Sequence, residues 1–126
     1  MLREAHSTPN APAAIGPYSQ AFRMEGRLVF LSGQIPLTPD GTLVEGDTAT
    51  QARQVMENIR AILESMNLSF AHVVKTTIFL RTMDDFAAVN DIYGRYFEAA
   101  PPARSTVAVA GLPRNVDVEI ECIAVW

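Results

Sequence analysis

One long amphipathic segment, residues 48–66, limits the folds that this chain can adopt. The sequence "TATQ" at its start fits a capping box, and Asn67 suits the left-handed residue that often ends a helix. A helix with a single apolar stripe must bury that stripe against another layer of structure. The apolar residues recur at spacings of three and four and form such a stripe: Ala52, Val55, Met56, Ile59, Ile62, Leu63 and Met66.

Segments rich in β-branched residues predict that the second layer is a sheet. Residues 72–81, "HVVKTTIFLR", have the composition of a strand, and further strands are expected near 105–110 and 116–125. Two strand-like runs also flank Glu25-Gly26, which fits a tight hairpin in which glycine supplies a positive φ.

A second helix is expected from about Asp84 to Ala99. Thr82 is suited to cap its start, and Pro101-Pro102 must stop it because proline cannot continue a helix. The expected order is therefore β-β-α-β-α-β-β. It predicts one α+β domain, residues 1–126, with both helices on one face of a mixed sheet of about six strands. Residues 1–14 are expected to be irregular, and the chain shows no internal repeat and no linker.

Composition narrows the classes of function. The formal net charge is −4 and the isoelectric point is near 5.0, which argues against a general nucleic-acid binder. The start of the chain lacks the apolar core of a signal peptide, and no stretch is long and apolar enough to span a bilayer. Cys122 is the single cysteine and excludes an internal disulfide. We expect a cytoplasmic protein that contacts no membrane.

The last expected strand suggests contact with a second copy of the chain. One of its faces is apolar throughout, and there Cys122 is expected to be an inert core thiol. The other face begins with Glu119 and Glu121 but turns apolar at Ile123 and Val125. Because two helices cover only one face of a sheet, we hypothesise that another subunit covers the second face.

Arg104 stands at the start of an apolar strand and has two interpretations. Its guanidinium is a rigid fork of donors that matches a carboxylate, so it can clamp a small carboxylic acid. The more common role of an arginine is to pair with an Asp or Glu, here within the chain or in a second subunit. Asn90 lies four residues after Phe86 and three before Tyr93, so its amide is on or beside the apolar helix face. Such an amide needs a hydrogen-bond partner, either the backbone or a ligand.

The remaining candidates also have a structural alternative. Glu119 can position a water or act as a general base, or it can belong to a solvated sheet face. Tyr18 can close a pocket or pack on the first hairpin. Ser32-Gly33 ends an apolar strand. The glycine can allow a ligand to approach the backbone closely, or it can be there only because the chain turns.

Several common catalytic signatures are absent from the sequence. His6 and His72 stand apart, so no metal-ligand cluster is expected. There is no nucleophile-elbow serine, no phosphate-binding glycine loop and no dinucleotide fingerprint. We therefore expect any catalysis to use neither a metal ion nor an organic cofactor.

Four short segments together resemble the RidA/YjgF family of imine deaminases, which also carries the name endoribonuclease L-PSP. The resemblance runs from about Gly16 to Val125, and residues 102–121 look like the C-terminal signature of that family. It implies a chorismate-mutase-like fold and a homotrimer with clefts between adjacent subunits. The segments are "GPYSQA", "SGQIP", "FAAVNDIY" and "PARSTVAVAGLPRNVDVEIE".

The resemblance also implies an activity, the hydrolysis of 2-imino acids such as 2-iminobutanoate and 2-iminopropanoate to 2-keto acids and ammonia. By resemblance, Arg104 holds the substrate carboxylate and Glu119 orients or activates the attacking water. Many members carry Cys two residues after the Arg, where this chain has Thr106, so thiol-based regulation is excluded at that position. The remaining residues implied to contact substrate are Tyr18, Ser32, Gly33, Phe86, Asn90, Ser105 and Thr106.

Two other functions compete with the deaminase. The first is a non-catalytic trimer that binds small carboxylates or acts as a holdase, in which Arg104 is needed and Glu119 is not. The second is a ribonuclease or translation inhibitor, an activity attributed to some relatives. The acidic isoelectric point and the lack of paired histidines argue against the second.

Overall fold

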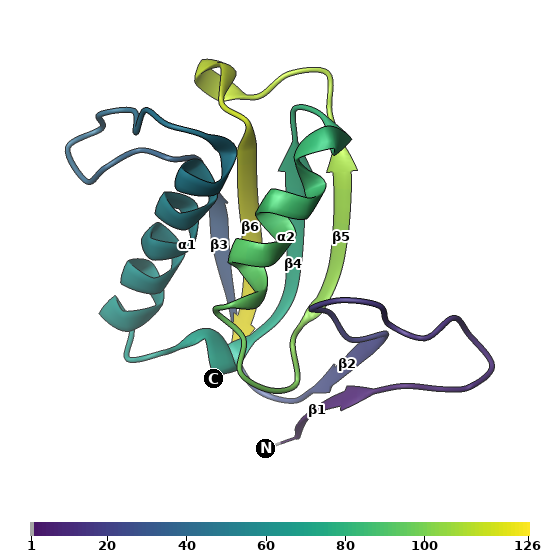
Figure 1. Ribbon diagram of the computed structural model, residues 1–126. Helices are drawn as coiled ribbons and strands as arrows, with labels where there is room; N and C mark the ends of the chain where they lie inside the picture. The colour runs from purple at the N-terminus through teal and green to yellow at the C-terminus, as the bar shows by residue number, and fades with distance from the viewer. Residues whose placement is uncertain (1) are drawn as a thin grey trace.

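The computed structural model describes residues 2–126. Two helices, α1 and α2, lie on one face of a sheet (Figure 1), which confirms the α+β prediction. The sheet has four strands and not about six, because the first two strands of the described chain pair only with each other. Strands β4 and β5 are parallel and are joined through α2, whereas the other neighbours in the sheet are antiparallel. The bounds are α1 Thr48–Ser65 and α2 Phe86–Gly94, with the strands in the order β3 Leu28–Gln34, β6 Val118–Val125, β4 Val73–Leu80 and β5 Ala103–Ala108.

The apolar stripe of α1 forms the centre of the core, as its spacing predicts. Five of its seven residues are buried, Ile62 is half-buried, and Met66 at the last turn is exposed. Asn67 has φ 60°, the left-handed conformation expected at the end of the helix. The start of the helix differs from the prediction, because the N-cap is Asp47 and not Thr48. The carboxylate of Asp47 accepts a hydrogen bond from the backbone N–H of Thr50.

Helix α2 is shorter than predicted. Thr82 caps a short 3-10 turn, η2 (Met83–Asp85), and the α-helix runs only from there to Gly94. Residues 95–97 continue as single turns, in which each backbone N–H donates to the carbonyl three residues earlier. Glycine weakens a helix interior, which explains why the regular helix ends well before Ala99.

The N-terminal strands pair differently from the prediction. Residues 1–14 were expected to be irregular, yet β1 (Arg3–His6) is a strand and pairs with β2 (Ala21–Met24). This two-stranded hairpin lies beside the start of β5 (Figure 1). No ladder joins β2 to β3 among the described residues, so the predicted hairpin at Glu25-Gly26 does not form. The backbone of Arg27 pairs instead with Trp126 at the end of β6, which draws the chain away from β2.

The sheet face opposite the helices carries large apolar side chains that are exposed to solvent. Phe30 is 70% exposed, and Leu28 and Val107 are also exposed. On β6 the alternation is as predicted over residues 118–124, since the core-facing residues are buried while Glu119 and Ile123 are half-buried and Glu121 is exposed. Val125, expected on the second face, is buried within the chain itself. Large apolar side chains left exposed on one face of a sheet favour association.

Candidate functional site

Arg104 lies on β5, on the sheet face that the helices cover. In the parallel pairing with β4 it is opposite Thr76, whose side chain is buried. Residues in register on neighbouring strands point to the same side of a sheet, so the guanidinium points towards α2. The guanidinium carbon lies 5.2 Å from the ring centre of Tyr18, 5.8 Å from that of Phe86 and 5.3 Å from that of Tyr93.

The polar partner of Arg104 within the chain is an amide. Its Nη1 donates to Oδ1 of Asn90 at 2.6 Å. None of the four ion pairs found in residues 2–126 includes Arg104, so the described chain does not supply the salt bridge that the sequence left open. Burial lowers the pKa of Arg104 from its usual value, and an arginine remains charged at neutral pH regardless. The cluster therefore holds a half-buried cation that aromatic faces and one amide oxygen compensate.

Helix α2 supplies three side chains to this cluster. Phe86, Asn90 and Tyr93 follow one another at spacings of four and three, so they share one helix face. Tyr93 was counted in the sequence only as an apolar position, but its hydroxyl forms a buried hydrogen bond of 2.7 Å with Thr76. Burial raises the pKa of Tyr93 above its ordinary value, so the phenol stays neutral beside the guanidinium. Its spacing from Asn90 was the signal that could have identified it.

The segment Gly16–Ser19 closes the cluster on the side of β5. Gly16 has φ +107°, and a Cβ there would lie 3.8 Å from the amide nitrogen of Asn90. The hydroxyl of Ser19 donates to the carbonyl of Pro101 at 2.5 Å, and its backbone donates to Pro102 at 3.1 Å. These bonds fix the segment to the start of β5 and so place the ring of Tyr18 beside Arg104.

Thr106 points to the same sheet face as Arg104, two residues further along β5. It is in register with the buried Ile78. Its hydroxyl oxygen is buried and has no hydrogen-bond partner in the structure. An unpaired buried hydroxyl costs free energy, and a ligand that reached it would recover that cost.

Glu119 belongs to a second cluster on the opposite face of the sheet. It is opposite Phe79 of β4, which alternates with the buried Ile78. A Cβ on Gly33 would lie too close to a carboxylate oxygen of Glu119 in its present position, so the glycine lets that side chain lie directly against the backbone of β3. Burial, and then the neighbouring Glu121, raise the pKa of Glu119 above its ordinary value. Ser32 is exposed beside it on β3.

Two groups of expected site residues thus lie on opposite faces of one sheet. Ser105 is on the face of Glu119, where its hydroxyl accepts from Nζ of Lys75 at 3.3 Å. A single copy of the chain does not bring the carboxylate of Glu119 to the guanidinium of Arg104. The first group comprises Tyr18, Phe86, Asn90, Arg104 and Thr106, and the second comprises Ser32, Gly33, Ser105 and Glu119.

Other kinds of site were also sought. No group of three His, Cys, Asp or Glu side chains in the described part of the chain is arranged to hold a metal ion. No helix within residues 2–126 is long and apolar enough to cross a membrane. Cys122 is buried, and burial raises its pKa to about 12, which agrees with the inert core thiol that the sequence predicts.

Comparison with known proteins gives a consistent result. The profile of the family described as Endoribonuclease L-PSP matches residues 8–126. Protein DfrA of Myxococcus xanthus is 55% identical over 99% of this chain and 97% of its own length. The 2-iminobutanoate/2-iminopropanoate deaminase of Mus musculus is 48% identical over 99% of this chain and 93% of its own length.

The fold also matches solved structures. The crystal structure of the yjgF gene product of E. coli is similar with a TM-score of 0.75 and 47% identity, over 97% of this chain and 98% of that one. Agreement in sequence and in fold therefore extends over nearly the whole length of the chain.

Proposed function

We propose, since this chain belongs to the endoribonuclease L-PSP family of RidA/YjgF proteins, that it hydrolyses small 2-imino acids to 2-keto acids and ammonia. A relative that is 48% identical bears the name of that activity. The substrates proposed are 2-iminobutanoate, 2-iminopropanoate and their enamine tautomers.

The observation that carries the proposal is the unpaired charge of Arg104. A half-buried guanidinium that has aromatic rings around it and no carboxylate partner among the described residues is arranged to receive an anion. Asn90 holds one edge of the fork through its bond to Nη1, which orients the other donors. The carboxylate of a 2-imino acid matches that fork, and the free hydroxyl of Thr106 offers a further contact.

Glu119 is the proposed base in the reaction. The oxygen of a water attacks the carbon of the C=N bond while the carboxylate of Glu119 accepts its proton. Glu119 passes this proton to the nitrogen, which gives a carbinolamine. The proton of the new hydroxyl group then moves through Glu119 to the nitrogen, the C–N bond breaks as the C=O bond forms, and ammonia and the 2-keto acid leave. The raised pKa of Glu119 suits it to this role, because a more basic carboxylate accepts a proton more readily.

The separation of Arg104 from Glu119 supports a site that two copies of the chain build together. We propose a homotrimer in which the Arg104 group of one subunit faces the Glu119 group of the next. The exposed apolar side chains of the sheet face that carries Glu119, Phe30 among them, support burial of that face between subunits.

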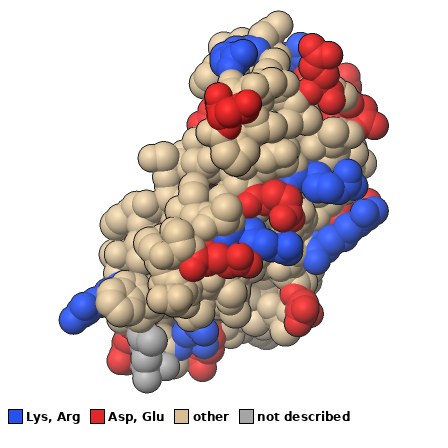
Figure 2. All heavy atoms as spheres, turned by 90° about the vertical axis from the view of Figure 1, so that its left-hand side faces the viewer, with Lys and Arg blue, Asp and Glu red and all other residues tan. Residues whose placement is uncertain are grey.

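A binding protein without catalysis is the second candidate. It is favoured by the same separation, because one chain alone offers the carboxylate clamp without the base. Nucleic-acid binding finds no support on the face shown in Figure 2, where Lys and Arg side chains lie among Asp and Glu.

The test generates 2-iminobutanoate with a threonine dehydratase and traps it with semicarbazide in the presence of this protein. We expect the parent to accelerate loss of the trappable imine and Arg104→Ala to lower kcat/KM by roughly ten- to a hundredfold, because a charge-assisted contact contributes about 1.5–3 kcal/mol.

Arg95→Gln is the matched control, since Arg95 is an exposed arginine paired with Asp91. It should act like the parent. Equal rates for Arg104→Ala and the parent would exclude the clamp. Binding of 2-ketobutanoate by the parent without imine turnover would favour the second candidate.

A further inference from the structure

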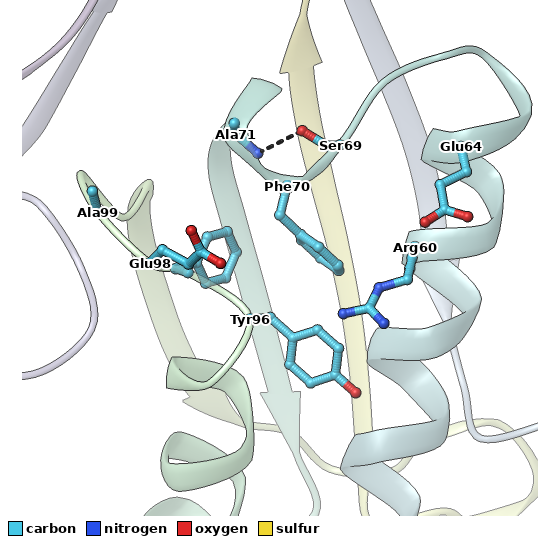
Figure 3. Close-up of a pocket in the computed structure, with 9 residues that line it drawn as sticks. Arg60, Glu64, Ser69, Phe70, Ala71, Tyr96, Glu98 and Ala99 are labelled. Atoms are coloured by element: carbon cyan, nitrogen blue, oxygen red, sulfur yellow. Dashed lines mark hydrogen bonds between the residues drawn. The ribbon is translucent and has the colours of Figure 1, made fainter.

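A pocket outside both groups of site residues lies where the second half of α1 meets the segment that follows α2. Its volume is about 400 Å³, which is within the range of pockets that hold small molecules. Figure 3 shows two aromatic rings in its middle, Arg60 on the α1 side and Glu98 on the opposite side. None of its lining residues belongs to the Arg104 or the Glu119 group.

The wall of the pocket is aromatic. The ring centres of Phe70 and Tyr96 are 5.3 Å apart, and those of Phe70 and Phe97 are 5.4 Å apart. Together these rings offer an apolar surface to a side chain of similar size. The hydroxyl of Tyr96 donates to Glu57 at 2.7 Å, which holds its ring in place.

The pocket is lined by charged side chains of both signs, one arginine and two glutamates, which do not pair with one another. Arg60 places its guanidinium 5.0 Å from the ring centre of Tyr96, and its ion pair with Glu57 is long, at 3.4 Å. The other two charged lining residues, Glu64 and Glu98, are paired with no cation within the described chain. In Figure 3 the carboxylate of Glu98 lies across the rings from Arg60.

This pattern selects among ligand classes. A simple anion would meet Arg60 but also two carboxylates, and a simple cation would meet those carboxylates but also Arg60. A zwitterion satisfies both signs at once, and the aromatic wall calls for an apolar group on it.

We propose that this pocket binds a free α-amino acid with a bulky apolar or aromatic side chain. Its carboxylate pairs with Arg60, its ammonium group pairs with Glu98, and its side chain packs on Phe70 and Tyr96. The site is independent of imine hydrolysis, so it stands even if the function proposed above fails.

The experiment is a titration of the 15N-labelled full-length protein with L-phenylalanine, followed by NMR amide shifts. Saturable shifts are expected at residues 69–71 and 96–99, which line the pocket. Two probes each lack one charge, 3-phenylpropanoate without the ammonium group and phenethylamine without the carboxylate. Both should bind about tenfold more weakly, the factor that corresponds to the loss of one charge-assisted bond.

Variants then assign the contacts. Arg60→Gln should weaken the binding of L-phenylalanine about tenfold and leave the binding of phenethylamine unchanged. Glu98→Gln should also weaken the binding of L-phenylalanine about tenfold but leave that of 3-phenylpropanoate unchanged. Arg23→Gln is the matched control, because Arg23 is an exposed arginine paired with a glutamate on the distant hairpin. It should bind like the parent.

Three results would overturn the proposal. The first is the absence of saturable shifts at millimolar L-phenylalanine. The second is a set of shifts confined to the Arg104 group and abolished by Arg104→Ala, which would place the amino acid on the other clamp. The third is equal affinity for L-phenylalanine and for either probe that lacks one charge.

Discussion

Glu119 and Glu121 project from the same face of β6, two residues apart, and the charge of Glu121 makes that of Glu119 less favourable. Burial of Glu119 is the larger cause of its raised pKa, and Glu121 is the second. Since the proposed base must be ionised, activity should fall as the pH drops through this raised pKa. The position of the acid limb of the rate profile therefore reports on both residues.

Glu121→Gln removes the second cause and leaves the proposed base intact. The pKa of Glu119 should decrease, so the acid limb of the profile of kcat/KM against pH should move to lower pH while the plateau at neutral pH stays. Imine hydrolysis measured across the acid range checks this.

Glu119→Gln is the companion variant and should lower kcat by about a hundredfold or more through loss of the general base. An acid limb that does not move in Glu121→Gln would mean that another group titrates.

At the scale of elements, the start of α1 is joined to the sheet through one carboxylate. Asp117 precedes β6, and its side chain accepts from Thr48 at 2.9 Å and from Gln51 at 3.2 Å. The same carboxylate pairs with Arg81, which follows β4, at 2.7 Å. One side chain thus connects α1, β4 and β6, and it is largely buried.

Asp117→Ala should lower the free energy of unfolding by about 2 kcal/mol, because it leaves several polar partners without their acceptor. Asp91→Ala is the control, since Asp91 forms an exposed pair with Arg95 on α2 and should change stability by less than about 0.5 kcal/mol. Thermal and urea unfolding at one fixed protein concentration measure both. Equal losses in the two variants would show that the connection contributes nothing beyond an exposed ion pair.

Elements with a clear period were predictable from sequence, and those whose pairing depends on distant segments were not. The stripe of α1 and the alternation of β6 each identify their own buried face. The hairpin at Glu25-Gly26 was predicted from local turn preference, but the backbone bonds of Arg27 to Trp126 compete with that turn from the far end of the chain. No local pattern reveals such a competitor.

The candidate site divides in the same way. The helix spacing brought Phe86 and Asn90 together, as expected. The face of Arg104 could not be derived, because "ARSTVAVA" mixes small, polar and apolar residues without a clear alternation. Only its register against Thr76 fixes the side to which it points, and therefore its separation from Glu119.

At the scale of the whole molecule, a site shared between subunits predicts complementation. Arg104→Ala and Glu119→Gln should each retain at most about a tenth of the parent activity when expressed alone. A mixed trimer contains one copy of one variant and two copies of the other. One of its three sites then combines an intact Arg104 group with an intact Glu119 group, so about a third of the parent activity should return.

The measurement is imine hydrolysis by co-expressed variants that carry different tags and are purified through both. Mixed trimers without recovered activity would contradict a site that two subunits build. A mixture in which the subunits are prevented from exchanging is the control and should stay inactive.

Strand β6 follows every other strand in the sequence, yet it lies between β3 and β4 in the sheet. During synthesis β3 and β4 leave the ribosome before the strand that joins them exists, so neither can acquire that neighbour while the chain is growing. The four-stranded sheet therefore closes only after residues 118–125 have emerged. A nascent chain stalled before Val118 should remain sensitive to proteases, whereas one that exposes Val125 should become resistant in a single step.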